Sequence, residues 1–116
     1  MRIASDNSHA LRWLARGKLN LHLRVLRRRD NGFHDILSWM QPIDWGDELT
    51  LRPAAHGDDV RLICKPAGLP TGDDNLIVRA ARRLAALTGR SAGVTIHLVK
   101  RLPIGGGLGG GSADAA

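Results

Sequence analysis

Residues 100–116 read KRLPIGGGLGGGSADAA, a short basic and apolar lead followed by six glycines around one leucine. Glycines let the backbone approach a ligand closely and point successive N–H groups toward it. A helix that begins directly after the glycines adds the positive end of its dipole, which attracts anions. The segment therefore predicts a phosphate-binding loop over residues 105–112, where the Ser112 hydroxyl could contact a phosphate oxygen or a metal.

Several known loop types compete for this glycine run. A Walker A loop is excluded, because Gly111 stands where its lysine would be. A dinucleotide fingerprint fits Gly105, Gly107 and Gly110, but almost any glycine run contains that pattern, and a flexible linker is a weaker alternative. The Pro-x-x-x-Gly-Leu-Gly-x-x-Ser loop of the GHMP small-molecule kinases fits in order. Its matching residues are Pro103, Gly107, Leu108, Gly109 and Ser112.

The composition is that of an ordinary globular chain. Hydrophobic residues make up 43% and charged residues 24%, which excludes a disordered chain. No apolar run approaches the roughly 20 residues of a membrane-spanning helix, so we expect no membrane partner. The single cysteine, Cys64, excludes an internal disulfide and suits a reducing compartment.

The formal net charge of +6 needs a separate interpretation. Four arginines crowd residues 24–29, but no aromatic residue interleaves with them to stack on bases. A solvated basic turn therefore explains them better than a nucleic-acid site, and we expect no nucleic-acid partner.

The first half of the chain predicts antiparallel strands. Apolar and polar residues alternate over residues 18–25, which predicts a half-buried strand. A turn at residues 30–32 leads into a second strand over residues 33–43. A further turn at residues 44–47 should precede short strands at residues 48–52 and 60–64.

The second half introduces a helix. Residues 75–88 have helical spacing, with Asp73, Asp74 or Asn75 available as the cap and Gly89 as the stop. Residues 93–100 alternate again as a strand and lead to the glycine loop. The order predicts an α+β fold, an antiparallel β-rich region with packed helices and a glycine-rich phosphate loop.

The two ends suggest the domain limits. We expect residues 1–16 to be an N-terminal extension without a secretory signal, with a short transit peptide as a weaker alternative. Residues 17–116 would form the domain, truncated at its C-terminal end, because a natural domain seldom stops one turn into a helix. We expect a bacterial-type cytoplasmic location, with a plastid not excluded.

Four segments carry a resemblance to a known enzyme family: KLNL at residues 18–21, RRDNGFH at residues 28–34, DNLIVRA at residues 74–80, and residues 100–116. In this order and spacing they resemble the 4-diphosphocytidyl-2-C-methyl-D-erythritol kinases, a family of the GHMP kinase superfamily. The resemblance implies the N-terminal, ATP-binding lobe of a GHMP kinase.

The resemblance also implies a reaction. ATP, with Mg²⁺, would phosphorylate the 2-hydroxyl of 4-diphosphocytidyl-2-C-methyl-D-erythritol in non-mevalonate isoprenoid precursor synthesis. Lys18 would be catalytic, the cytidine-diphosphate substrate would contact Asn20, Phe33 and His34, and no residue is assigned as a metal ligand. The ATP-binding residues would be Asn75, Lys100, Pro103, Gly105, Gly106, Gly107, Leu108, Gly109, Gly110, Gly111 and Ser112.

The sequence departs from the family pattern at a few positions. Arg16 and Gly17 replace Pro-Ala before the lysine, Ala113 replaces a second loop serine, and Phe33 replaces the usual tyrosine. The later Gly-x-Asp-x-Pro segment, which supplies the presumed base, is absent, so we expect the 116 residues alone to be inactive. The alternatives are another GHMP kinase, such as a mevalonate or homoserine kinase, and a dinucleotide-binding module.

Overall fold

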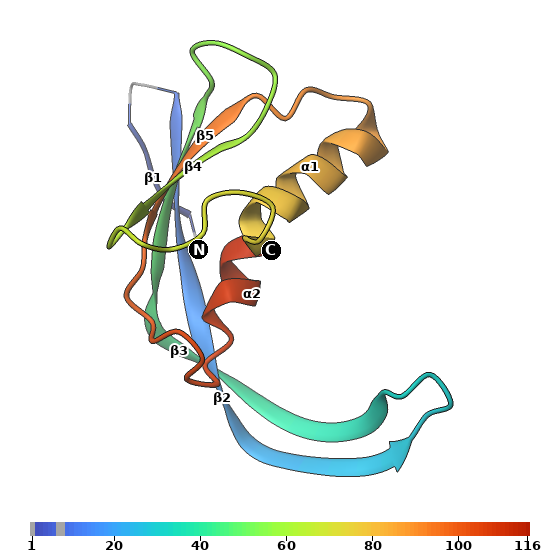
Figure 1. The fold of residues 1–116 in the computed structure, drawn as a ribbon. Coiled ribbons are helices and arrows are strands. Elements are labelled where there is room, and N and C mark those ends of the chain that lie inside the picture. The colour runs from blue at the N-terminus through green and yellow to red at the C-terminus, as the bar shows by residue number, and fades with distance from the viewer. Residues whose placement is uncertain (1, 7–8) are drawn as a thin grey trace.

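The computed structural model describes residues 2–6 and 9–116 and has an α+β fold, as the sequence predicted. Five strands form one sheet in the order β1-β2-β3-β5-β4, and two helices lie on the same side of it (Figure 1). The elements are β1 (Arg2–Asp6), β2 (Ala10–Arg28), β3 (His34–Pro53), β4 (Arg61–Lys65), α1 (Leu76–Thr88), β5 (Val94–Val99) and α2 (Gly110–Ala115).

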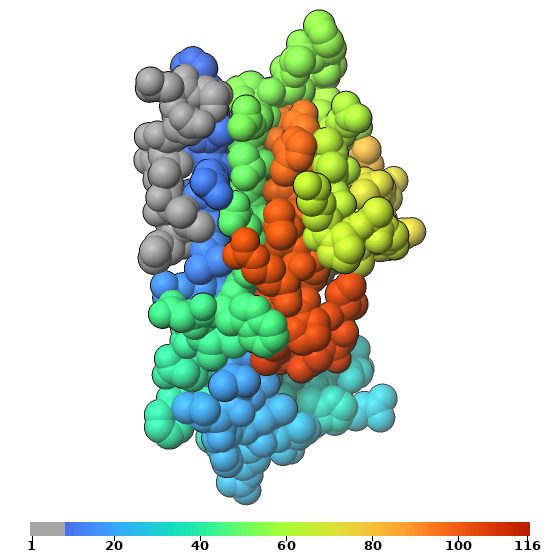
Figure 2. Space-filling view, turned by 90° about the vertical axis from the view of Figure 1, so that its left-hand side faces the viewer, coloured from blue at the N-terminus to red at the C-terminus, as the bar shows by residue number. Residues whose placement is uncertain are grey.

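The strand pairing is antiparallel except at one edge. β2 and β3 form a long hairpin around the turn predicted at residues 30–32, where Gly32 has a φ of 86°. β5 pairs antiparallel with β3, but β4 pairs parallel with β5. The crossover through α1 brings the chain back in the same direction, which requires a parallel pair. Figure 2 shows β2, β3, β5 and β4 side by side across the sheet.

The turn predicted at residues 44–47 is wrong, because β3 runs through these residues as one strand. The ladder bulges here, since Arg16 pairs with Gly46 while Lys18 pairs with Pro42. Gly46 lies directly against β2, and a Cβ at this position would overlap the carbonyl oxygen of Ala15. The glycine thus permits close strand approach and not a chain reversal.

The predicted strand over residues 18–25 is confirmed, but its expected half-burial is wrong. Leu19, Leu21 and Leu23 are all exposed, as is Val25. The outer halves of β2 and β3 curve away from the body as a two-stranded ribbon that neither α1 nor α2 reaches (Figure 1). We call residues 19–41 the ribbon.

The core lies between α1 and the inner part of the sheet. Its buried side chains come from β3, β4, β5 and α1, namely Leu49, Leu62, Ile77, Val78, Ile96 and Leu98. Of the three residues expected as the cap, Asn75 is the one that caps α1: its Oδ1 accepts the N–H of Ile77 at 2.9 Å. Gly89 ends the helix in the left-handed conformation, as predicted.

The segment expected to be an N-terminal extension contributes to this sheet. Its described residues form β1 and the beginning of β2, with Ala10 buried. The rest of residues 1–16 lies outside the described part of the chain. Among the described residues, no helix is long and apolar enough to cross a membrane.

Gly46→Ala should destabilise the protein by about 1–3 kcal/mol or more, because the added methyl group must displace the backbone of β2. Gly72→Ala is the matched control, since an added Cβ there meets nothing within 4 Å. Urea denaturation of the two variants measures the difference. Equal midpoints would show that β2 and β3 do not approach each other this closely at Gly46.

Candidate nucleotide-binding site

The glycine loop joins β5 to α2 and has the conformation that its composition predicts. Gly105, Gly107 and Gly109 have φ values of 70°, 75° and 69°, in the left-handed region that disfavours other residues. Gly109 is the N-cap of α2, so the loop delivers the chain directly to the helix N-terminus. The backbone alone therefore requires glycine at three alternate positions.

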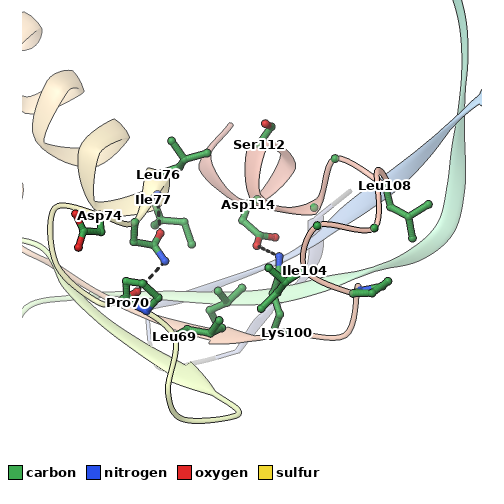
Figure 3. A pocket seen from close by; sticks show the side chains of 18 of the residues that line it. Leu69, Pro70, Asp74, Leu76, Ile77, Lys100, Ile104, Leu108, Ser112 and Asp114 are labelled. Carbon is green, nitrogen blue, oxygen red and sulfur yellow. Dashed lines mark hydrogen bonds and ion pairs between the residues drawn. The ribbon is translucent and has the colours of Figure 1, made fainter. Parts of the chain in front are cut away.

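A pocket of about 380 Å³ lies between this loop and the start of α1. Its volume falls within the usual range for small-molecule sites. Apolar side chains such as Leu69 and Ile104 form part of the wall, and the loop backbone forms another part (Figure 3). Every residue predicted to bind ATP lines this pocket: Asn75, Lys100, Pro103, Gly105, Gly106, Gly107, Leu108, Gly109, Gly110, Gly111 and Ser112.

Lys18, the predicted catalytic residue, reaches the loop from β2. Its backbone N–H donates to the carbonyl of Leu108 at 2.9 Å, and its Nζ donates to the carbonyl of Gly107 at 2.6 Å. A Cβ on Gly109 would lie 3.1 Å from Cε of Lys18, so the lysine stem packs on the loop. The structure thus places the ammonium group at the middle of the glycine loop.

Lys100 is held between two buried carboxylates. Its Nζ lies 2.7 Å from Oδ2 of Asp47 and 2.9 Å from Oδ2 of Asp114. The side chains of Asp47 and Asp114 are 0% and 2% exposed. Asp47 also accepts, on Oδ1, the backbone N–H groups of Arg101 at 2.6 Å and Leu102 at 2.8 Å. An Asp–Lys–Asp cluster therefore adjoins the pocket, and two of its members, Lys100 and Asp114, line it.

The residues predicted to bind the second substrate lie on the ribbon. Asn20 accepts a hydrogen bond from the hydroxyl of Ser38 across the hairpin, at 3.2 Å. Phe33 is 74% exposed at the ribbon tip, and His34 pairs with Arg28 in the ladder. None of Asn20, Phe33 and His34 is among the described residues that line the pocket.

Comparison with known proteins identifies this arrangement. The model of the GHMP kinases N terminal domain matches residues 75–116, which include α1 and the glycine loop. A crystal structure of 4-(cytidine 5'-diphospho)-2C-methyl-D-erythritol kinase matches this chain with a TM-score of 0.72 and 38% sequence identity. The match covers 90% of this chain and 36% of the kinase chain. Residues 75–116 therefore match the N-terminal domain of the GHMP kinases, and the chain as a whole resembles this family.

Curated relatives extend this match. The chain is 50% identical over 102 residues to the 4-diphosphocytidyl-2-C-methyl-D-erythritol kinase of Salinibacter ruber, and 53% identical over 102 residues to that of Pseudomonas aeruginosa. Each alignment covers 88% of this chain but only 35% or 36% of the relative. The chain thus spans about a third of the length of these relatives. The crystal structure of a homoserine kinase from Cytophaga hutchinsonii shares the fold, with a TM-score of 0.66 and 19% sequence identity. That match covers 97% of this chain and 34% of the homoserine kinase chain.

The sequence alone does not single out Asp47 or Asp114 as site residues. Asp47 lies in a segment with the composition of a turn, and Asp114 lies in the segment of residues 100–116, beyond the last residue predicted to bind ATP. A signal was present, since Asp114 lies two residues after Ser112 in the first turns of the helix that follows the loop. The partner on β3 is 67 positions away along the chain, and no local pattern links the two.

The two carboxyl groups of the cluster have pKa values shifted in opposite directions. Burial opposes ionisation of Asp47, but hydrogen bonds from Lys100 and from the backbone of Leu102 and Arg101 outweigh it and lower its pKa. Burial dominates at Asp114 and raises its pKa to about 6, with Lys100 opposing and Asp47 adding to the rise. Oδ1 of Asp114 has no hydrogen-bond partner among the described residues, which agrees with the greater cost of its charge.

This split predicts a pH-dependent stability. The pKa of Asp114 is about 6 in the folded state and 3.8 is its ordinary value, which applies to the unfolded chain. Between these two pH values the folded state therefore retains a proton that the unfolded chain has lost. The contribution of Asp114 to the free energy of unfolding should therefore fall as pH rises from about 4 to about 6, and level off above.

Asp114→Asn removes this titration, so the stability of the variant relative to the parent should increase between pH 4 and pH 6.5. Carboxyl groups with lowered pKa, such as Asp47, change their contribution below this window. Urea denaturation at several pH values measures this relative stability, and Asp44→Asn, at an exposed position, serves as the control. Parallel stability curves for Asp114→Asn and the parent would contradict the assignment.

Proposed function

We propose that this chain forms the phosphate-donor site of a kinase that transfers the γ-phosphoryl group of ATP to the 2-hydroxyl of 4-diphosphocytidyl-2-C-methyl-D-erythritol. One observation carries the proposal: the pocket is lined by a loop with left-handed glycines at three alternate positions and by the N-terminus of the helix that follows. Such a surface presents N–H groups to a polyphosphate without a steric barrier. The identity of the acceptor is inferred from the names of the relatives, which are 4-diphosphocytidyl-2-C-methyl-D-erythritol kinases.

The donor set fits a nucleotide better than an independent metal site. Among the described residues, no group of three or more His, Cys, Asp or Glu side chains could hold a metal ion. Two of the carboxylates near the pocket, Asp47 and Asp114, are engaged with Lys100, and Asp74 also lines the pocket. Mg²⁺ commonly binds through substrate phosphates with few protein ligands, so its ligands here would be mainly ATP oxygens. When bound, it would neutralise charge on the phosphates.

The contacts of Lys18 with the glycine loop support a role in phosphoryl transfer. Its Nζ lies at the carbonyl of Gly107, within the loop that would hold the phosphates. Phosphoryl transfer requires mainly positioning and charge neutralisation, which an ammonium group provides. We propose that Lys18 stabilises the charge that develops between the donor and the acceptor hydroxyl.

We propose the ribbon as the site of the acceptor. It begins next to Lys18 and carries Asn20, Phe33 and His34, whose exposed surfaces are available to a ligand. His34 would hydrogen-bond the cytosine edge and Phe33 would pack on the ring. The nucleotide and the acceptor are small molecules, and we propose no nucleic-acid or membrane partner and a cytoplasmic location.

The direct experiment is an activity assay on the protein encoded by the complete reading frame that contains residues 1–116, which we call the complete protein. ATP, Mg²⁺ and 4-diphosphocytidyl-2-C-methyl-D-erythritol should give a phosphorylated product, while homoserine and mevalonate should give none. Phosphorylation of homoserine instead would favour the second candidate, which only the shared fold supports. A lack of ATP binding would overturn the proposal.

Lys18→Ala in the complete protein should lower turnover by about 10²–10³-fold, because the ammonium group acts mainly on charge in the transition state. The Kd for ATP should change by less than about fivefold, because the backbone hydrogen bond from residue 18 to Leu108 remains. Lys65→Ala, at an exposed position on β4, is the control. Turnover equal to that of the control would remove Lys18 from the mechanism.

His34→Ala should raise the KM for the cytidine substrate at least about tenfold and leave the KM for ATP nearly unchanged. A site built to hydrogen-bond a base edge discriminates strongly when its polar partner is removed. His56→Ala, in an exposed loop before β4, tests for a general effect of histidine removal. An equal rise in both KM values would indicate a folding role for His34.

A further inference from the structure

We propose that Asp47 is a positioning residue that fixes both ends of the glycine loop. Its Oδ1 accepts the N–H groups of Arg101 and Leu102, at 2.6 and 2.8 Å. These two residues lead the chain from β5 into the loop. The carboxylate is fully buried on β3, next to the strand that the chain has just left. The entry to the loop is therefore fixed to the centre of the sheet.

The other carboxylate oxygen reaches the exit of the loop through Lys100. Oδ2 of Asp47 accepts from Nζ of Lys100, and the same Nζ donates to Asp114 on α2 (Figure 3). A Cβ on Gly110, the first residue of α2, would lie only 3.1 Å from this Nζ. The ammonium group therefore packs directly against the first turn of α2 and joins it to β3.

The positive charge of Lys100 is neutralised by the two carboxylates of this cluster. The side chain is 11% exposed and its ammonium group faces two carboxylates, so the described cluster carries a formal charge of −1 when both are ionised. An ammonium group in that position offers little attraction to a phosphate. Lys100 thus lines the pocket with its stem, and its charge holds α2 in place.

A loop held at both ends before the ligand arrives loses less conformational freedom on binding. The middle of the loop is held separately by Lys18, through Leu108 and Gly107. Removing the charge of Asp47 should therefore weaken nucleotide binding without removing a group that touches the nucleotide. The expected loss of nucleotide binding rests on the proposed function, whereas the expected loss of conformational order in the loop does not.

The test is Asp47→Asn in the complete protein. Asparagine has nearly the same shape and keeps one oxygen for the two backbone N–H groups, but its NH₂ group would face the ammonium group of Lys100. Asp44→Asn is the matched control, because Asp44 lies on the same strand with its side chain 85% exposed. Amide hydrogen exchange without nucleotide, the Kd for ATP, and the turnover at saturating ATP are measured on each.

For Asp47→Asn we expect exchange to increase about tenfold or more at residues 101–112 and to stay unchanged at the ribbon. The Kd for ATP should rise at least tenfold, while turnover at saturating ATP should change less than about threefold. Unchanged exchange at residues 101–112 would overturn the proposal, and so would a uniform increase over the whole chain, which would indicate general destabilisation.

A second variant guards against a folding defect. In Asp47→Asn combined with Lys100→Gln, the new glutamine can accept from the asparagine and donate to Asp114, which restores the chain of hydrogen bonds without charge. Recovery of slow exchange at residues 101–112 supports positioning by this chain of contacts, and no recovery contradicts it. If the parent protein binds no ATP, the proposed function fails, while the exchange data still decide the role of Asp47.

Discussion

The site depends on one buried carboxylate, that of Asp47. A charged group removed from water is costly unless hydrogen bonds and an opposite charge replace its hydration. Asp47 has both, from the backbone of Arg101 and Leu102 and from the ammonium group of Lys100. Because these donors all belong to the segment that enters the glycine loop, satisfying the carboxylate also fixes where that loop begins.

The path of β3 follows from the same constraint. A turn at residues 44–47 would point Asp47 toward solvent, whereas the continuous, bulged strand directs it beneath the loop. Gly46 makes this possible by letting β3 lie against the backbone of Ala15. The bulge also separates two parts of the hairpin: the inner part belongs to the sheet body, and the outer part becomes the ribbon. Lys18 lies at the junction of the two.

The features that could be predicted from the sequence are local ones. The left-handed glycines of the loop, the turn at Gly32 and the helix stop at Gly89 depend on residues next to one another, and all are found. The α+β class follows from periodicity for a similar reason. The segments that resemble a known family also point to the pocket, since all the residues expected at ATP line it.

The remaining features depend on contacts between distant parts of the chain. Gly46 and Asp47 have the composition of a turn, and only the approach of Ala15 and of residues 100–102 makes them part of a strand. The apolar alternation of residues 18–25 correctly indicates a strand, but burial depends on what covers it, and α1 and α2 cover only the inner sheet. Asp114 is not evident from the sequence because Asp47, the other carboxylate that contacts Lys100, is remote along the chain.

We propose that the glycine loop is a preformed polyphosphate site on the sheet body. Titration of the ¹⁵N-labelled complete protein with ATP and Mg²⁺, followed by the backbone amide resonances, tests this proposal most directly. We expect the largest shift changes at residues 105–112 and at the start of α1 around Asn75, with little change at Gly57 and at the end of α1 near Gly89. Saturable changes that fall mainly outside the pocket, or no change at millimolar ATP, would contradict it.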